Sequence, residues 1–216
     1  MSSDTTVRVT EVFHSLQGET SRVGLPTVFI RLAGCPLRCK WCDTPYSFTG
    51  GLTRTLGYLL NELDQFNTRY VCVTGGEPLA QRNCLHLLTA LCNAGYLVSL
   101  ETSGAVDISQ VDSRVSRIVD VKPPGSGESE RNHWANFDLL TVQDEVKFVL
   151  ADRGDYDWAL EVMRGHDLAE RCPVLFSPVF GQLSPALLAH WVLEDRAPVR
   201  LQLQLHKLLW GEERGR

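Results

Sequence analysis

Three cysteines near the start of the chain have a spacing that suits a metal cluster. Cys35, Cys39 and Cys42 are separated by three residues and then by two. Three thiolates can bind three irons of a cubane cluster, which leaves the fourth iron without a protein ligand. Structural zinc sites usually have four ligands and paired C-x2-C spacing. We therefore expect a [4Fe–4S] cluster. The alternatives are a zinc site completed by a histidine or by Cys172, and three unrelated buried thiols.

A glycine-rich segment offers a second place for a ligand. Residues 74–78, with the sequence TGGEP, directly follow a short apolar run that is typical of a strand. Gly75 and Gly76 let a backbone approach a ligand closely, and the carboxylate of Glu77 can accept a hydrogen bond from an ammonium group. Alone, the segment is equally consistent with a plain turn. Its position at the strand after the cysteine loop favours ligand binding.

Together the two segments resemble the signature of the radical S-adenosylmethionine (SAM) superfamily, including an aromatic residue, Trp41, before the last cysteine. In that superfamily the amino and carboxylate groups of SAM chelate the open iron. One electron from the cluster then cleaves SAM to a 5′-deoxyadenosyl radical, which abstracts hydrogen from the substrate. The resemblance implies that this chain binds SAM and that the TGGEP segment contacts its amino group. The protein then positions the cofactor, which carries the difficult chemistry.

From about residue 9 to the C-terminus the chain further resembles one radical SAM family, the 7-carboxy-7-deazaguanine synthases of queuosine biosynthesis. The segments that carry this resemblance are LQGE (16–19), FIRL (29–32), CDT (42–44), ETSG (101–104), DVK (120–122), SPVF (177–180) and QLHK (204–207). That family converts 6-carboxy-5,6,7,8-tetrahydropterin to 7-carboxy-7-deazaguanine and ammonia, works as a homodimer and needs Mg²⁺. The resemblance implies the same lyase activity here, with a flavodoxin-like electron donor.

The resemblance and the side-chain chemistry together give the candidate site residues. We expect the substrate to be bound by Leu16, Gln17, Gly18, Glu19, Arg31, Thr74 and His206. We expect Glu101 and Arg31 to act in catalysis and Thr44 to bind Mg²⁺. We expect SAM to be contacted by Trp41, Cys42, Asp43, Gly76, Glu77, Asp120, Val121, Lys122 and Ser177.

Elementary chemistry agrees with several of these roles. A pterin carboxylate suits a planar two-donor partner such as Arg31, and a guanine-like edge suits the mixed donors and acceptors of Gln17 and Thr74. A hydroxyl such as that of Thr44 is a hard oxygen ligand for Mg²⁺. For several residues a structural role remains open: Thr44 as a cap, Glu101 as a strand-end residue and His206 as a surface histidine.

Two other functions are consistent with the cysteine loop. A glycyl-radical activase has a similar size and the same loop but acts on a protein, and the LQGE, arginine-strand and His-Lys segments argue against it. A non-catalytic iron–sulfur carrier or a zinc-binding module would not cleave SAM. The ultraviolet–visible spectrum of anaerobically purified protein, with and without SAM, separates these classes.

The motifs must be positioned by alternating strands and helices. Apolar runs predict strands at 28–32, 70–73, 96–100, 118–121, 146–150, 174–176 and 199–205. Helical periodicity predicts helices at 56–66, 85–92 and 156–163, and a fourth after Ser184 that buries Leu187, Leu188, Trp191 and Val192. Such alternation predicts an α/β fold, a partial TIM-like barrel of about six parallel strands with outer helices, in which the loops after the strands carry the chemistry. We expect one domain, 1–216, in which residues 123–136 form a loop that could act as a mobile lid.

Composition narrows the class of protein. A formal net charge of −5 gives no electrostatic reason to expect nucleic-acid binding. The polar N-terminus is unlike a secretory signal, and the longest uncharged stretch, 172–193, is interrupted by prolines, so we expect a cytoplasmic protein without a membrane partner. The cysteines outside the loop, Cys72, Cys84, Cys92 and Cys172, are expected to pack in the core.

Overall fold

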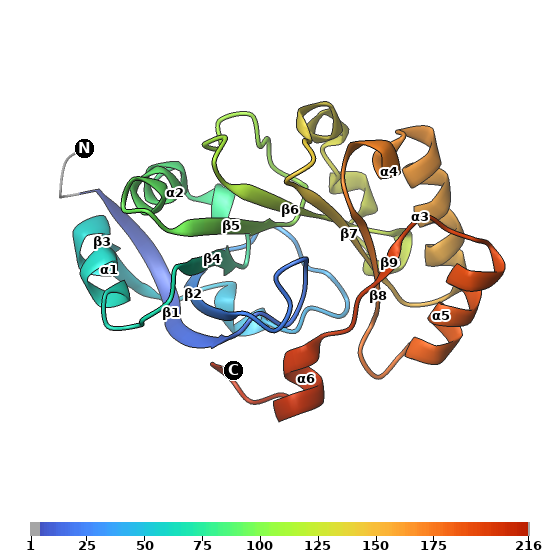
Figure 1. The fold of residues 1–216 in the computed structure, drawn as a ribbon, viewed down its shortest axis with the longest axis horizontal. Helices are drawn as coiled ribbons and strands as arrows, with labels where there is room; N and C mark the ends of the chain where they lie inside the picture. Colours follow the sequence, from blue (N-terminus) through green and yellow to red (C-terminus); the bar gives the residue numbers. More distant parts are fainter. Residues whose placement is uncertain (1–4, 216) are drawn as a thin grey trace.

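The computed structural model describes residues 5–215, which form one nine-stranded sheet in the order β3-β1-β2-β4-β5-β6-β7-β8-β9 (Figure 1). The strands are β1 (Thr6–Leu16), β2 (Pro26–Leu32), β3 (Leu52–Thr55), β4 (Tyr70–Gly75), β5 (Leu97–Thr102), β6 (Ser116–Val121), β7 (Glu145–Leu150), β8 (Val174–Pro178) and β9 (Arg200–Leu201). Strand β2 and strands β4 to β9 pair in parallel, whereas β1 pairs antiparallel with both β2 and β3. The sheet is thus a largely parallel partial barrel with an antiparallel edge.

Helices follow most of the parallel strands and cover the outside of the sheet. They are α1 (Leu56–Leu63), α2 (Cys84–Asn93), α3 (Arg153–Gly165), α4 (Leu168–Arg171), α5 (Pro185–Glu194) and α6 (Leu205–Trp210). Short 3₁₀ helices lie at Pro45–Ser47, Pro78–Ala80, Pro124–Ser126, Ser129–Arg131 and Trp134–Leu139. Figure 1 shows α6 apart from the other helices, below the sheet. No helix in the described residues is long and apolar enough to cross a membrane.

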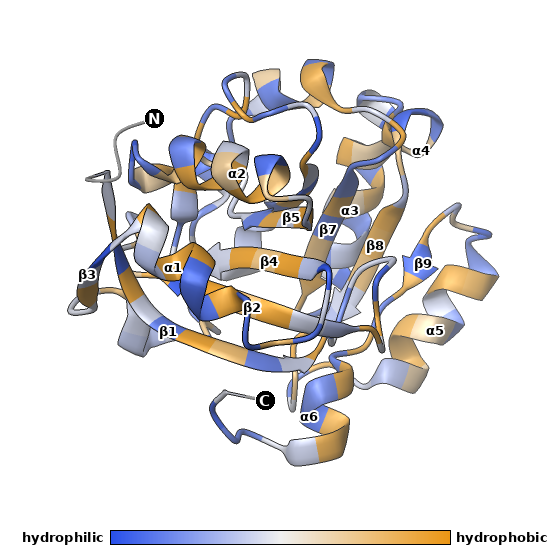
Figure 2. Ribbon diagram, turned by 60° about the vertical axis from the view of Figure 1, so that its left-hand side comes forward, coloured by the Kyte–Doolittle hydropathy of each residue, from blue (hydrophilic) through white to orange (hydrophobic). Residues whose placement is uncertain are grey.

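One face of each parallel strand packs against the outer helices, and the other face points to the inside of the barrel. The side chains on the inner face are therefore the ones that line the interior. On β6, Val119 and Val121 belong to the core cluster under the outer helices, whereas Ile118 and Asp120 line the inner side. This alternation follows from the two-residue repeat of a strand. Figure 2 shows apolar residues concentrated along the central strands, whereas the helices mix apolar and polar residues. One continuous core therefore supports a polar interior.

The structure differs from the sequence prediction at both ends. Strands β1 and β3 were not predicted, because β1 mixes polar and apolar residues and β3 is only four residues long. The predicted strand 199–205 is wrong: only Arg200 and Leu201 pair with β8, and helix α6 begins at Leu205. The apparent leucine alternation does not mark a buried face, since Leu201 is exposed whereas Gln202 is 6% exposed. In α5, Leu188 is buried as expected, but Leu187 faces outward.

The segment 123–136, which the sequence predicts as a loop and candidate lid, is folded into three short 3₁₀ helices. Asn132 ties it to β6, because its side-chain oxygen accepts from Lys122 N at 2.9 Å and its Nδ2 donates to Lys122 O at 2.9 Å. Ser126 O accepts a backbone hydrogen bond from Lys40 N at 3.0 Å. The segment thus packs against the cysteine loop.

Candidate active site

A cavity of about 720 Å³ lies inside the partial barrel, at the side where the parallel strands end. It is large enough for a cofactor and a small substrate, since ligand pockets typically measure ~300–1,000 Å³. Every residue predicted for the site lines it, with the exception of Glu77, Val121 and Ser177. Residues from β1 through α6 therefore meet in one place although they are spread over most of the sequence.

The cysteine loop leaves β2 and forms one wall of the cavity. Cys35, Cys39 and Cys42 are free thiols that all line it. The loop approaches the TGGEP segment so closely that a Cβ added to Gly76 would lie 2.7 Å from the Cβ of Cys35. Glu77 N also donates to Gly34 O at 2.8 Å. Glycine at position 76 is therefore required for the two predicted ligand-binding segments to meet.

The three thiols fit the donor set of an iron–sulfur cluster. Burial raises the pKa of the Cys35 and Cys39 thiols, the nearby Cys42 raises both further, and the Lys122 ammonium opposes the rise. These mutual effects indicate that the thiols lie within electrostatic range of one another. In residues 5–215 no group of three or more His, Cys, Asp or Glu side chains could hold a metal ion as it stands. A cubane cluster differs from a single-ion site, because each of its cysteines binds a different iron.

Glu101, at the end of β5, is the centre of a polar cluster. Gln17 Nε2 donates to Glu101 Oε1 at 3.3 Å, and Thr74 Oγ1 donates to Glu101 Oε2 at 3.2 Å. Cys72 Sγ lies 3.6 Å from Glu101 Oε1. Cys72 is buried as predicted, but on the inner side of β4 beside this carboxylate and outside the main core cluster. Residues predicted to bind substrate are thus joined by hydrogen bonds before any ligand is present.

Arg31 on β2 has a protein partner that the sequence did not reveal. Its Nε donates to Glu11 Oε1 at 2.7 Å, and Tyr46 Oη donates to the same oxygen at 2.9 Å. Burial works to lower the pKa of Arg31, but Tyr46 and Glu11 outweigh it and the pKa is raised. The guanidinium also lies 5.7 Å from the ring centroid of Phe13. Glu11 was missed because it lies on β1, the unpredicted strand.

A second buried cation, Lys147 on β7, was also missed. Its Nζ lies 2.8 Å from Glu19 Oε2 and 3.6 Å from Asp120 Oδ2. Lys122 Nζ lies 3.1 Å from the same Asp120 oxygen. Burial works to lower the pKa of Lys147, but Glu19, Asp120 and Glu101 outweigh it and hold the pKa well above its usual value. The signal was a lysine inside the apolar run EVKFVL, the same kind of signal that singled out Arg31.

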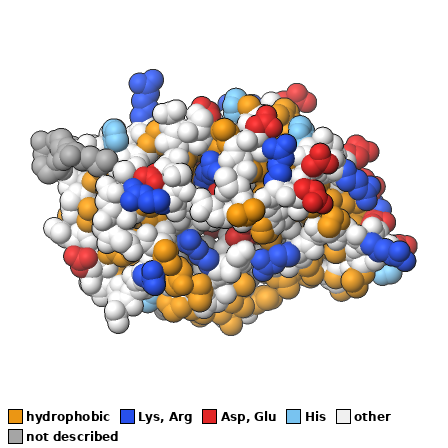
Figure 3. Space-filling model, turned by 45° about the horizontal axis from the view of Figure 1, so that its top comes forward, with side chains coloured by type: hydrophobic (Ala, Val, Ile, Leu, Met, Phe, Trp, Pro, Cys, Tyr) orange, Lys and Arg blue, Asp and Glu red, His pale blue; other side chains and the backbone are white. Residues whose placement is uncertain are grey.

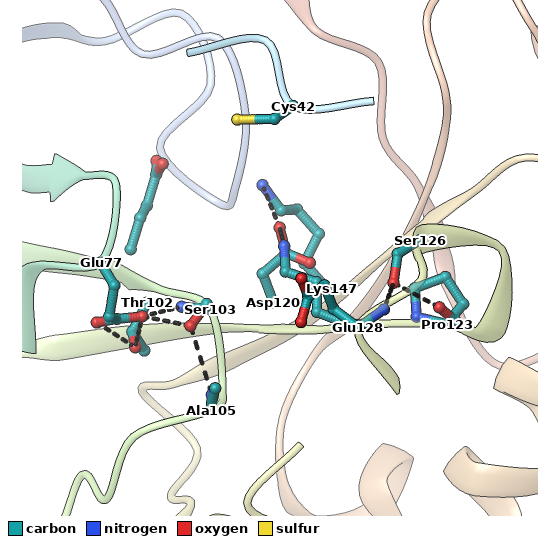
Figure 4. A network of polar contacts seen from close by, with 12 residues as sticks. Cys42, Glu77, Thr102, Ser103, Ala105, Asp120, Pro123, Ser126, Glu128 and Lys147 are labelled. Carbon is teal, nitrogen blue, oxygen red and sulfur yellow. Dashed lines mark hydrogen bonds and ion pairs between the residues drawn. The ribbon is translucent and has the colours of Figure 1, made fainter. Parts of the chain in front are cut away.

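Glu77, which the sequence predicts to contact SAM, has its carboxylate bonded to groups of the protein. It is fully buried and accepts from Leu79 N at 2.9 Å, from Thr102 Oγ1 at 3.0 Å and from Ser103 N at 2.6 Å. Figure 4 shows this cluster to one side of the Asp120–Lys147 pair, with Cys42 above them. The carboxylate therefore joins the loops after β4 and β5, and a contact with an ammonium group would need it to exchange an existing partner.

Two further predicted side chains do not line the cavity. Val121 is 1% exposed and packs in the core, because the strand alternation turns it away from Asp120 and Lys122. Ser177 on β8 is also 1% exposed. The expected contacts of Val121 and Ser177 with SAM stay predictions, and in this geometry they would be made by the backbone.

Helix α6 returns the chain to the LQGE segment. Leu205 N donates to Gly18 O at 2.9 Å, and a Cβ at Gly18 would overlap the His206 ring. Burial lowers the pKa of His206. Lys207 Nζ lies 3.4 Å from Asp43 Oδ2. Desolvation works to raise the pKa of Asp43, but the cations Lys207, Lys147 and Arg31 together outweigh it, so the pKa is lowered.

The remaining wall includes Thr44 and the C-terminal residues. Thr44 Oγ1 lies 3.9 Å from Cys42 Sγ, next to the cysteine loop. Residues 211–215, for which the sequence gave no role, also line the cavity. The Arg214 guanidinium lies 4.0 Å from the ring centroid of Tyr46, whose hydroxyl binds the partner of Arg31. The C-terminal segment is thus part of the cavity mouth.

Comparison with known proteins shows which family this chain belongs to. Residues 29–165 match the model of the radical SAM superfamily. The chain is 44% identical to the 7-carboxy-7-deazaguanine synthase of Chlorobaculum tepidum, over 99% of this chain and 98% of that protein. It is 42% identical to the synthase of the same name from Koribacter versatilis, over 96% and 98%. The crystal structure of QueE from Escherichia coli covers 94% of this chain and 99% of that one, with a TM-score of 0.73 at 22% identity, a likeness of fold.

Proposed function

Because this chain belongs to the radical SAM superfamily and, within it, to the 7-carboxy-7-deazaguanine synthases, we propose that it makes 7-carboxy-7-deazaguanine for queuosine biosynthesis. The reaction is the ring contraction of 6-carboxy-5,6,7,8-tetrahydropterin with release of ammonia. The observation that carries the proposal is the meeting of the cysteine loop, Arg31 and the Glu101 cluster in one cavity. The family membership implies a [4Fe–4S] cluster and SAM as cofactors.

The cysteine loop suits the cluster, with Cys35, Cys39 and Cys42 as its ligands. When bound, the cluster and SAM supply the one-electron chemistry that begins a radical reaction on the substrate. The chain's own task is to orient SAM and the substrate and to keep water away. Trp41, Asp43, Gly76, Asp120 and Lys122 line the cavity beside the thiols and are the proposed SAM contacts, whereas Glu77 acts through the loops that it joins.

The pterin then lies between Arg31 and the Glu101 cluster. The terminal guanidinium nitrogens of Arg31 suit the substrate carboxylate, because Glu11 occupies only Nε. Leu16, Gln17, Gly18, Glu19, Thr74 and His206 line the same region and offer donors, acceptors and an apolar wall to the ring system. Glu101 is the proposed catalytic carboxylate, since it is the acceptor on which Gln17 and Thr74 converge.

Mg²⁺ and the protein partners form the finer part of the proposal. Thr44 is the proposed Mg²⁺ ligand, supported by its place in the cavity lining and by its hydroxyl oxygen, which lies 3.9 Å from Cys42 Sγ. A homodimer is supported by exposed apolar side chains concentrated near the C-terminus: Leu187, Leu193, Leu201, Leu208 and Leu209. Figure 3 shows hydrophobic side chains gathered along the lower margin of one face. The proposed source of the electron is an external, flavodoxin-like donor. The proposed single domain is supported by the one continuous hydrophobic core.

The test is anaerobic turnover of the reconstituted protein with SAM, Mg²⁺, a chemical reductant and the carboxypterin. Mass spectrometry should detect 7-carboxy-7-deazaguanine, with ammonia released in equal amount. The matched control is Cys39→Ala, which should produce neither product nor 5′-deoxyadenosine. If the wild-type protein cleaves SAM but forms no deazaguanine from the carboxypterin, the proposed substrate is wrong.

A further inference from the structure

Three charged residues meet inside the cavity from three separate parts of the chain. Glu19 lies after β1, Asp120 lies on β6 and Lys147 lies on β7, and the Lys147 ammonium contacts both carboxylates. We refer to these residues as the charged trio. The side chain of Lys147 is only 9% exposed. A lysine is rarely buried without a partner, so the two carboxylates explain how it is tolerated but not why it is there.

Each carboxylate of the trio has one oxygen that the protein does not satisfy. Glu19 Oε1 and Asp120 Oδ1 are buried and have no hydrogen-bond partner within residues 5–215. A buried acceptor left unpaired costs free energy, and native proteins leave few of them. Both residues line the cavity, although these two oxygens are themselves covered, so a bound ligand supplies the missing N–H or O–H partner only if the carboxylate turns toward it.

A structural role alone does not account for the trio. Buried ion pairs are often no more stable than apolar residues of similar volume, because desolvation offsets the attraction. Here the two carboxylates belong to segments proposed for different ligands, Glu19 for the pterin and Asp120 for SAM. The ammonium of Lys147 lies where it can hold both carboxylates at once.

We propose that Lys147 is a positioning residue, which fixes Glu19 as an acceptor for the pterin and Asp120 as an acceptor for SAM. The inference rests on the proposed function, because it takes the two ligands from there. Without the Lys147 ammonium, the negative charges of the two buried carboxylates would be less well neutralised. Each carboxylate would then rotate, bind water or take up a proton. Lys147 thereby acts on ligands that it need not touch.

The surrounding charges make the expected effect unequal for the two ligands. Asp120 keeps Lys122 as a second cation at 3.1 Å, whereas the only ion-pair partner of Glu19 in residues 5–215 is Lys147. Glu101 and Asp43 also lie within electrostatic range of Lys147. Replacing Lys147 by a neutral residue should therefore weaken the pterin more than SAM. We expect the dissociation constant of the pterin to rise about tenfold or more, which corresponds to the loss of one hydrogen bond to a charged group. We expect the dissociation constant of SAM to rise about threefold.

The chain offers a matched control on the same two neighbouring strands. Arg117 on β6 and Asp144, just before β7, form a buried ion pair at 2.6 Å with side chains 10% and 0% exposed. Neither residue lines the cavity. Arg117→Met therefore removes a buried cation of similar setting, with a comparable effect on folding, but leaves the charged trio in place.

The experiment measures binding without turnover. The [4Fe–4S] protein is kept oxidised under anaerobic conditions, and the dissociation constants of SAM and of 6-carboxy-tetrahydropterin are measured separately by calorimetry. Lys147→Met should weaken binding of the pterin about tenfold or more, and Lys147→Arg should recover part of that affinity. Arg117→Met should change neither dissociation constant. Glu19→Gln should weaken binding of the pterin only, and Asp120→Asn should weaken binding of SAM only.

The outcomes separate the inference from the proposed function. Unchanged pterin affinity in Lys147→Met, or an equal loss in Arg117→Met, overturns the positioning role. If Lys147→Met does not fold, Glu19→Gln decides, because unchanged pterin affinity in that variant also overturns it. If the wild-type protein binds SAM but neither binds nor converts the carboxypterin, it is the proposed substrate that fails.

Discussion

Replacing Arg31 by alanine should abolish efficient use of the carboxypterin while SAM is still bound and slowly cleaved. Arg31 lines the cavity from β2, and its Nε is already held by Glu11 at 2.7 Å. This pairing fixes the plane of the guanidinium and leaves the terminal nitrogens for the substrate carboxylate. The alanine variant loses that planar pair of donors, whereas the proposed SAM contacts lie on other segments.

The structure sets the size of the effect. Two charge-assisted hydrogen bonds to a substrate carboxylate together contribute about 3 kcal/mol, which corresponds to roughly 10²-fold in kcat/KM. Arg31→Lys should recover at most about tenfold, because a point charge does not reproduce the planar fork. Glu11→Gln keeps a hydrogen-bond acceptor for Nε but removes its charge, so a loss of about threefold is expected.

The assay follows 7-carboxy-7-deazaguanine and 5′-deoxyadenosine side by side, over a range of pterin concentrations. Thermal denaturation is recorded for each variant, because Arg31→Ala also leaves Glu11 without its cation. Both side chains are partly exposed, at 15% and 22%, so the stability loss should be about 1 kcal/mol. Arg114→Ala, which removes an exposed ion pair with Asp112, is the control and should leave turnover unchanged.

A near wild-type kcat/KM for Arg31→Ala would refute the reasoning. Arg31 would then be a structural partner of Glu11, and the substrate carboxylate would need another cation. A parallel loss of SAM binding would also contradict it, because the effect would then be a general collapse of the cavity. The result that supports it is a low product yield together with continued formation of 5′-deoxyadenosine.

Three further predictions concern the metal sites and stability. Anaerobically reconstituted protein should hold about four irons per chain, measured by iron analysis and absorption spectra. Alanine at any of the three loop cysteines should abolish the cluster. Joint replacement of Cys84 and Cys172 should preserve it. Mg²⁺ should raise turnover, and Thr44→Ala should weaken that response; identical Mg²⁺ titrations in both proteins would reject the assignment. Burial works to raise the pKa of Asp144, but its hydrogen bonds from Arg117 outweigh burial and lower the pKa. The ion pair should therefore stabilise the fold fully above the unfolded-state pKa of about 4. This stabilisation should be lost as the pH falls through the lower pKa of Asp144 in the folded state. Asp144→Asn should flatten the acid side of the stability profile, and an unchanged pH dependence in urea unfolding would contradict this.

Much of the parallel sheet could be predicted because its strands are short apolar runs separated by helical periodicity. The pairs of β2 with β4 and of β6 with β7 lie where the sequence placed strands. The antiparallel edge escaped prediction because β1 is only partly buried and carries polar residues along much of its length. Helix α6 was not predicted, because six residues are too few to display a helical period, and the predicted strand 199–205 overlaps it only at Leu205.

The candidate site divides along a similar line. Residues in short motifs, such as those of the cysteine loop and the LQGE segment, could be named because type and spacing limit what they can do. Their partners could not: Glu11 comes beside Arg31 only through the pairing of β1 with β2, and Lys147 reaches the cavity from β7, and neither belongs to a motif. Glu77 shows another limit: the motif drew attention to its carboxylate, but the protein partners of that carboxylate, Thr102 and Ser103, come from a distant part of the sequence.

The saturation of Glu77 has a mechanical consequence for the cavity. Backbone amides and hydroxyls from two loops converge on one carboxylate, so the ends of β4 and β5 are cross-linked and should move as one body. Amide hydrogen exchange at Leu79 and Ser103 should accordingly be slow even before any ligand binds. A rigid floor of this kind cannot adjust itself to a bound molecule. The movement that ligand entry demands must then come from another part of the wall, such as the C-terminal residues at the cavity mouth.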